Sequence, residues 1–176
     1  NDINLAARGQ LSLNGAAQRE SRQSETTYGL ALKQDGSNFG HDRQAWQQEQ
    51  LVAANVAGRN VQLTAGGQMQ LDGSRITAEG DVKLQAGELR AGTVATRNSD
   101  SADRHSIGLL HSVRDSRSQV EDKQHGSEIR AGKQLTVQAG VLDGKGVVLS
   151  GANATVGGGK LQLTHALDSQ QASTLH

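Results

Sequence analysis

Three histidines in one polar stretch are, by type, the residues best suited to bind a metal ion. His105, His111 and His125 stand 6 and 14 residues apart. If a hairpin brought the three imidazoles together, they would offer the nitrogen ligands that zinc accepts. Those spacings match no recognised ligand pattern, and histidines on a solvated surface explain them more simply. We therefore expect no metal site.

Acidic residues that flank a sugar would indicate glycosidase or lyase chemistry. Such a reaction needs carboxylates gathered on one face of the fold. Asp72, Asp81 and Asp143 instead stand at corners between predicted strands. Aspartate at a corner is first of all a turn former, so we expect this chain not to be an enzyme.

The glycine-rich segment 151–160, GANATVGGGK, has the look of a phosphate-binding loop but not its spacing. Five residues rather than four separate Gly151 from Gly157, and Leu161 stands where Ser or Thr would be required. The overlapping sequence GGGKLQL (157–163) also lacks the Asp of a calcium-binding nonapeptide. We expect this segment to be a turn, and we expect no cofactor.

The aromatic residues are the better candidates for an interaction surface. The chain has one Tyr, one Phe and one Trp, and Tyr28, Phe39 and Trp46 all fall in one polar segment. Exposed aromatic residues often anchor interfaces, and a Trp face also suits a sugar or a cation. The alternative is that they pin their segment onto the rest of the chain. Leu109 and Leu110, in a second polar segment, admit the same two interpretations.

A repeat surrounds these segments and must position them. Residues 61–65 read VQLTA and residues 82–86 read VKLQA, which is a period of 21 residues. The joint DGSRITAEGDVKLQAG (72–87) also aligns with HGSEIRAGKQLTVQAG (125–140). Alternation with period 2 indicates strands with one buried face, and the residues between them are turn formers. Three short strands in a period near 20 predict a solenoid.

The physical form that fits this repeat is a parallel β-helix. One coil cannot bury its apolar side alone, whereas coils stacked at about 4.8 Å pair each strand with its copies above and below. Proline is absent and glycine numbers 22. A central strand excludes proline because it needs every backbone N–H, and we expect glycine at corners with positive φ.

Two polar excursions interrupt the coils, over about 18–50 and about 96–127. The segments SETTYGLAL (24–32) and DRHSIGLLH (103–111) align with each other. We expect each excursion to be a long β-hairpin that leaves between coils; a disordered loop is the alternative that its polarity favours. The repeat resumes at Ile129 and is expected to continue to the end of the chain. Residues 1–176 are thus expected to be a single β-helix segment.

Charge and composition limit the partners. Lys plus Arg is 18 and Asp plus Glu is 18, so no one-signed footprint for nucleic acid is present. The chain has no cysteine, which excludes a disulfide framework. No apolar run approaches the length of a membrane helix and no signal peptide is present. Because the chain opens within a repeat, we expect it to be a piece of a longer protein.

The coil phrase G-x-x-L-x-L-x-A-G, the joint G-S-x-I-x-A-G and polar excursions that return on I-x-A-G resemble the haemagglutinin repeats of filamentous haemagglutinin-like exoproteins. This resemblance extends over the whole chain, with looser spacing across 143–159. It implies a right-handed parallel β-helix of about 20-residue coils at the bacterial cell surface. It also implies a parent protein secreted by a two-partner system through an outer-membrane transporter.

The resemblance implies two functions for the parent. One is a contact-dependent growth inhibition effector whose shaft presents or delivers a C-terminal toxin to a neighbouring cell, with that cell's envelope or a receptor as partner. The other is a filamentous adhesin, associated with virulence, that binds a host-cell glycan or protein. In both, the segment described here is expected to be non-enzymatic shaft.

Overall fold

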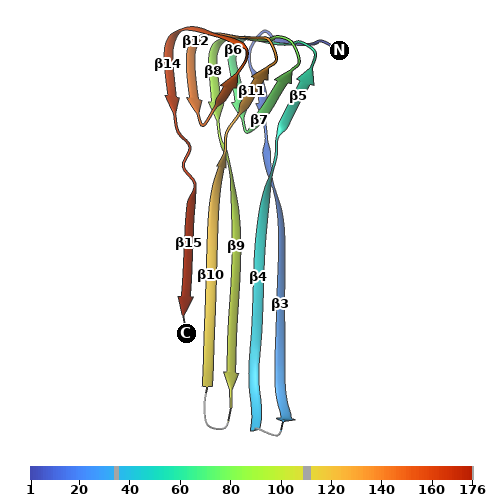
Figure 1. Ribbon diagram of the computed structural model, residues 1–176, viewed down its shortest axis with the longest axis vertical. Coiled ribbons are helices and arrows are strands. Elements are labelled where there is room, and N and C mark those ends of the chain that lie inside the picture. Colours follow the sequence, from blue (N-terminus) through green and yellow to red (C-terminus); the bar gives the residue numbers. More distant parts are fainter. Residues whose placement is uncertain (34–35, 109–111, 176) are drawn as a thin grey trace. The chain divides into compact units, whose positions relative to one another are not determined.

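The computed structural model describes residues 1–33, 36–108 and 112–175. These residues form strands and turns without a helix, arranged in three sheets, which confirms an all-β chain (Figure 1). The chain divides into two compact units. The first comprises Asn1–Ala17, Leu51–Ala95 and Gln124–Leu167, and the second comprises Gln18–Gln50, Thr96–Lys123 and Asp168–His176.

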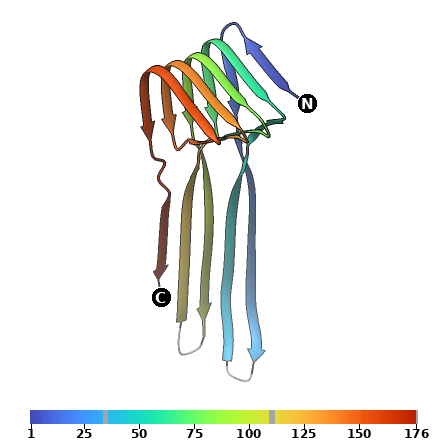
Figure 2. The ribbon, with the colours of Figure 1, turned by 45° about the horizontal axis from the view of Figure 1, so that its top comes forward.

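The first unit contains two parallel sheets. One has the order β1-β6-β8-β12-β14, with β2 also pairing with β6, and the other has the order β13-β11-β7-β5. Figure 2 shows their successive turns side by side, in the order of the chain. Their bounds are β1 (Ile3–Ala7), β2 (Leu11–Asn14), β5 (Ala54–Gly58), β6 (Val61–Asp72), β7 (Ser74–Ala78), β8 (Val82–Gly92), β11 (Glu128–Ala131), β12 (Gln134–Lys145), β13 (Val148–Ser150) and β14 (Asn153–Thr164).

The strand register reproduces the sequence repeat. Val61 is paired with Val82, so the period of 21 residues is the step from β6 to β8. Ile129 is paired with Ile76, so the two copies of the joint lie on neighbouring strands although an excursion separates them in sequence. The loosely spaced segment is also regular, because β12 and β14 are paired from Gln134↔Asn153 to Lys145↔Thr164.

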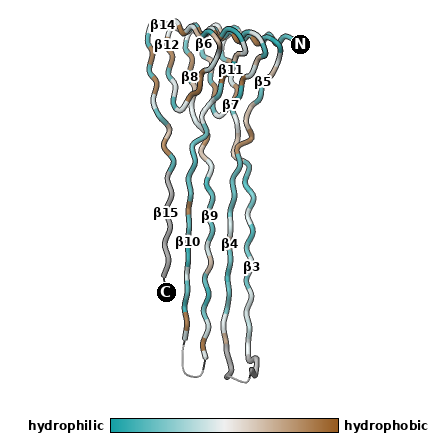
Figure 3. The backbone as a smooth tube through the Cα atoms, in the orientation of Figure 1, coloured by the Kyte–Doolittle hydropathy of each residue, from teal (hydrophilic) through white to brown (hydrophobic). Residues whose placement is uncertain are grey.

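The core is a set of columns in which one residue from each strand stacks on the next. In the register, one column runs through Ile3, Val61, Val82, Leu135 and Ala154. The largest apolar side chains with essentially no exposure are Leu63, Met69, Leu71, Ile76, Leu84, Ile129 and Leu135. Figure 3 shows apolar residues concentrated in this unit and mostly hydrophilic residues along β3, β4, β9 and β10. A narrow column explains how 34% hydrophobic residues suffice for a core.

The structure corrects the expectation of three short strands per coil. The apolar runs 61–65 and 69–71 belong to the single strand β6, whose pairing with β8 shifts register between Ala65 and Gln68. An inserted residue bends a strand without ending it. Two glycines, Gly66 and Gly67, stand at this bend, neither has a positive φ, and the strand continues through it.

The role expected for glycine is also corrected. In the described part of the chain, φ is positive only at Gly73 (54°) and Gly146 (62°). At several other positions glycine allows close packing of neighbouring strands. A Cβ on Gly87 would lie 3.1 Å from the carbonyl oxygen of Gly67, and one on Gly140 would lie 2.7 Å from that of Gly87.

Close packing of glycines between strands also explains why GANATVGGGK is not the turn that the sequence predicts. Residues 153–160 of that segment are the start of strand β14. Gly159 continues the glycine column, since a Cβ there would lie 3.0 Å from the carbonyl oxygen of Gly140. Gly158 and Gly159 are therefore explained by close stacking on β12 rather than by a sharp corner.

The second unit is built on one five-stranded sheet with the order β15-β10-β9-β4-β3. Strands β4 and β9 are antiparallel from Phe39↔Ile107 to Gln47↔Ser99, so the excursions are strands over the described residues and not disordered loops. The last strand, β15, pairs antiparallel with β10. That pairing corrects the expectation that the coil repeat continues to the end. The bounds are β3 (Ala16–Lys33), β4 (Gly36–Val52), β9 (Val94–Ile107), β10 (Ser112–His125) and β15 (Ser169–Leu175).

Candidate functional site

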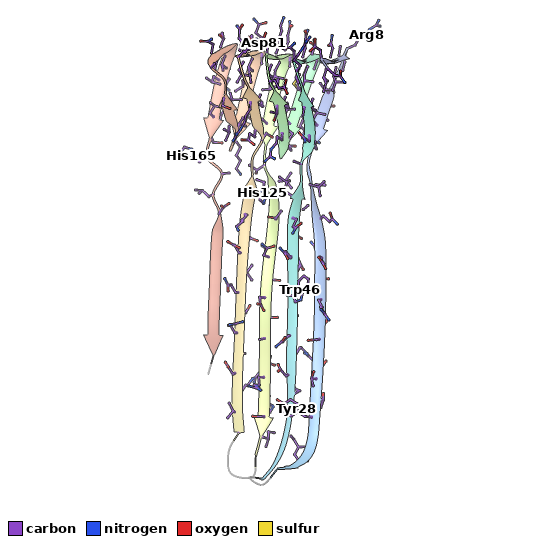
Figure 4. The ribbon with its side chains drawn as sticks, turned by 45° about the vertical axis from the view of Figure 1, so that its right-hand side comes forward. Arg8, Tyr28, Trp46, Asp81, His125 and His165 are labelled. Carbon is purple, nitrogen blue, oxygen red and sulfur yellow. The ribbon has the colours of Figure 1, made fainter. Side chains whose placement is uncertain are left out.

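The three aromatic residues all lie on the sheet of the second unit, but they do not form one cluster. Tyr28 is on β3, and Phe39 and Trp46 are on β4 (Figure 4). Side chains alternate between the two faces of a strand, so Phe39 and Trp46 project from opposite faces. The predicted Leu109 and Leu110 lie outside the described residues.

Tyr28 is half-buried against the neighbouring strand. A Cβ on Gly40 would lie 2.7 Å from Tyr28 Cε2, so the absence of a side chain at Gly40 makes room for the ring. A hydrogen bond with Tyr28 is the main cause that raises the pKa of the Arg104 guanidinium above its ordinary value. Tyr28 therefore ties β3 to β9 across β4, which is a structural role.

Phe39 lies on the face of the sheet opposite to Trp46, and two histidines lie close together on that face. Its Cα partner is Ile107, and both side chains are 47% exposed. His41 pairs with His105, with ring centroids 5.7 Å apart and ring planes at 75°. Asp103 Oδ2 lies 3.8 Å from His41 Nε2.

These histidines are not the set considered from the sequence. His105 lies beside His41, His125 ends β10, and His111 is outside the described residues. Within the described residues, no group of three or more His, Cys, Asp or Glu side chains is arranged to hold a metal ion.

Trp46 borders a hollow of about 360 Å³ on the sheet of the second unit. The hollow lies over three neighbouring strands, β4, β9 and β10, and within the register Trp46 stands opposite Asp100. Apart from Trp46 its lining is polar: Gln47, Gln48, Asn98, Ser99, Asp100, Gln119 and Glu121. The residues contributed by β9 and β10 carried no signal in the sequence, because only strand pairing brings them to Trp46.

A network of charged groups holds these strands together beside the hollow. The Glu49 carboxylate accepts hydrogen bonds from the backbone N–H of Arg97 at 2.8 Å and from Arg19 Nε at 2.8 Å. These bonds, that from Arg97 first, lower the pKa of Glu49 below its ordinary value. The Glu49 backbone N–H in turn donates to Asn98 Oδ1 at 2.9 Å. The amide of Asn98, which lines the hollow, is thereby fixed in position.

A second ion pair braces β9 against β10. Arg97 donates to both carboxylate oxygens of Asp122, from Nε at 2.7 Å and from Nη2 at 3.0 Å. This two-point contact lowers the pKa of Asp122 and raises that of Arg97. Planar, two-point pairs of this kind fix geometry as well as charge.

Two of the aspartates of the first unit connect neighbouring strands. Asp72 Oδ1 accepts the backbone N–H of Gly92 at 2.8 Å, and Asp81 Oδ1 accepts that of Gln134 at 3.2 Å. Each bond connects the aspartate to a neighbouring strand of the sheet. In a turn, the side chain would instead bond to the backbone two residues further along the chain. Asp81 lies between β7 and β8, where the sequence predicts a turn, and its side chain in addition bonds to β12. The sequence predicts a corner at Asp143, but Asp143 lies inside β12, where it is the Cα partner of Arg90 on β8.

Comparison with known families identifies the repeat. Residues 35–114 match the hemagglutinin repeat. The matched stretch contains β4, the coil strands β5 to β8 and β9, so it includes the G-S joint of residues 73–74 and one leg of each excursion. No curated protein and no solved structure matches the chain.

The match supports the filamentous haemagglutinin-like family over these residues. Hemagglutinin repeats are generally structural or adhesive rather than catalytic, and they imply a secreted or cell-surface exoprotein. Among the described residues, no helix is long and apolar enough to cross a membrane.

Proposed function

We propose that this chain is a non-enzymatic segment of the shaft of a large bacterial surface exoprotein, in which the parallel coils form a right-handed β-helix. The hemagglutinin-repeat match over 35–114 carries this proposal. The in-register pairing of successive coils supports it, because strands that repeat in one register can be added without limit. Each added coil lengthens such a shaft by about 4.8 Å.

The bonds between coils suit a part whose task is mechanical. Ser127 Oγ donates to the backbone oxygen of Leu71 at 2.8 Å and accepts the backbone N–H of Ser74 at 3.2 Å. Asp72 and Asp81 add the coil-to-coil bonds already described. Carboxylates engaged in this way are structural, which favours a non-enzymatic role.

Our first candidate for the parent is a contact-dependent growth inhibition effector. Its shaft would present a C-terminal toxin and deliver it to a neighbouring cell, whose envelope or receptor is the partner. Export of the parent would use the outer-membrane transporter of a two-partner system. Neither the toxin nor the export function is assigned to the present residues.

Sequencing the parent gene beyond residue 176 tests this candidate. We expect a compact, non-repetitive C-terminal domain followed by a small separate reading frame for an immunity protein. Deleting that small frame is then expected to make the strain sensitive to its own parent strain in mixed culture. Repeats that end without such a domain and frame would contradict toxin delivery.

The second candidate is a filamentous adhesin that binds a host glycan or protein. The observation that favours it is the exposed, aromatic-bordered sheet of the second unit, with Trp46 at a hollow on one face and Phe39 beside Ile107 on the other. Binding of the isolated chain to host cells, and loss of binding on replacing Trp46, would favour this candidate over toxin delivery.

A further inference from the structure

The hollow of about 360 Å³ on β4, β9 and β10 brings the chain's only tryptophan next to amide and carboxylate side chains. We infer that this hollow binds a neutral oligosaccharide, with one sugar ring packed against the indole of Trp46. The inference rests on the second of the two proposed functions, to which it adds a ligand class and a site.

Strand pairing places the polar groups on the same face as Trp46. Trp46 stands opposite Asp100, and Asn98 lies two residues from Asp100 and therefore on the same face. Arg117 Nη2 is 4.0 Å from Asp100 Oδ2. That contact places Arg117 on this face too, together with Gln119 two residues further along β10.

The chemistry of the lining suits hydroxyl groups. Each sugar hydroxyl both donates and accepts, and a lining of amides and carboxylates offers both functions. Asn98 Oδ1 is already bonded to the Glu49 N–H at 2.9 Å, which leaves Nδ2 as the donor of that side chain. Asp100 and Glu121 supply acceptors. The C–H face of a sugar ring is apolar and packs against the face of an aromatic ring.

Charge in and around the hollow favours a neutral ligand over a cation. Asp100 has Arg117 beside it, and Lys123 Nζ lies 3.3 Å from Glu121 Oε1. A cationic ligand would have to compete with these side chains for the carboxylates. A protein anchor would require apolar surroundings for the aromatic residue, whereas the remaining lining residues are polar.

The test uses the fluorescence of Trp46, which reports on the hollow without interference because no other Trp is present. Lactose, maltose and N-acetylchitobiose are each titrated into the chain to about 50 mM. We expect at least one to change the emission in a saturable way, with half-saturation below about 10 mM. Tetramethylammonium chloride, the cationic probe, is expected to leave the emission unchanged.

Two variants connect the signal to the site. Gln119→Ala removes an exposed lining amide and is expected to weaken that sugar about tenfold with unchanged circular dichroism. Phe39→Ala, on the opposite face, is the matched control and is expected to bind like the original chain. The inference is overturned if no sugar changes the emission, if tetramethylammonium saturates it, or if Gln119→Ala binds as tightly as the control. A negative result would remove the sugar site but leave the gene-sequence test of toxin delivery unaffected.

Discussion

Replacing Ser127 by alanine tests whether hydrogen bonds inside the stack hold the coils together. Ser127 is 1% exposed and lies at the joint that follows the second excursion. Its hydroxyl donates to the Leu71 backbone oxygen at 2.8 Å. It also accepts from the Ser74 backbone N–H at 3.2 Å and from the Ser74 hydroxyl at 3.3 Å.

These three hydrogen bonds determine how much stability the substitution is expected to remove. Ser127→Ala leaves a buried backbone N–H without this partner and removes a donor from a buried carbonyl, at roughly 1–3 kcal/mol for each unsatisfied group. We expect a loss of about 2–4 kcal/mol in the free energy of unfolding. Ser74→Ala is the matched control, since it removes only the longest of the three bonds and should cost about 0.5–1 kcal/mol.

Urea denaturation of the two variants measures this difference. Circular dichroism follows the strands of the whole chain, while Trp46 fluorescence follows the second unit, so loss in the first unit is recognised by the difference between the two signals. A cost for Ser127→Ala no greater than that for Ser74→Ala would refute the argument. The stack would then be held by its apolar columns, with the serine bonds contributing nothing measurable.

Three further predictions follow from the core, the glycine column and the ion pairs. Ile129→Ala is expected to destabilise the chain by about 2–5 kcal/mol because Ile129 is fully buried. Val148→Ala, at a side chain 53% exposed, should cost under about 0.5 kcal/mol. The urea midpoints of the two variants measure the difference. Gly140→Ala should lower the melting temperature because its Cβ would lie 2.7 Å from the Gly87 oxygen, while Gly157→Ala, with nothing within 4 Å of the new Cβ, should not; equal melting temperatures would contradict the stacking role. Glu49 has a folded-state pKa below the ordinary 4.5, so its contribution is complete above pH 4.5 and is lost as the pH falls through the folded pKa. Urea midpoints from Trp46 emission should therefore fall in acid, and Glu49→Gln should reduce that fall.

Glycine shows where sequence reasoning reached the right residues for the wrong reason. Its abundance and its place between apolar runs predict corners, and corners predict positive φ. At Gly67, Gly87 and Gly140 the structure instead shows the backbone passing so close to its neighbour that a Cβ would meet a backbone oxygen. Proximity between coils is a property of the stack, and a single coil's sequence contains no record of it.

The candidate site was predictable in part. Concentration of all three aromatic residues in one excursion is visible in the sequence, and one of them, Trp46, lines the hollow. The partners of Trp46 were missed because Asp100 and Gln119 come from the second excursion. One aromatic residue and amides scattered along the sequence form no recognisable motif. Only the antiparallel pairing of the strands brings them to one place.

The sequence by itself determined the period, the buried positions and the matching of the two joints, because alternation and repetition are local and each coil repeats the same physical problem. Only the tertiary structure decided that the two excursions share one sheet, that β15 joins it, and which polar groups meet Trp46. Those outcomes depend on backbone hydrogen bonds between segments far apart in sequence. Polar strands supply such bonds without any particular side chain, so their pairing leaves little trace in residue types.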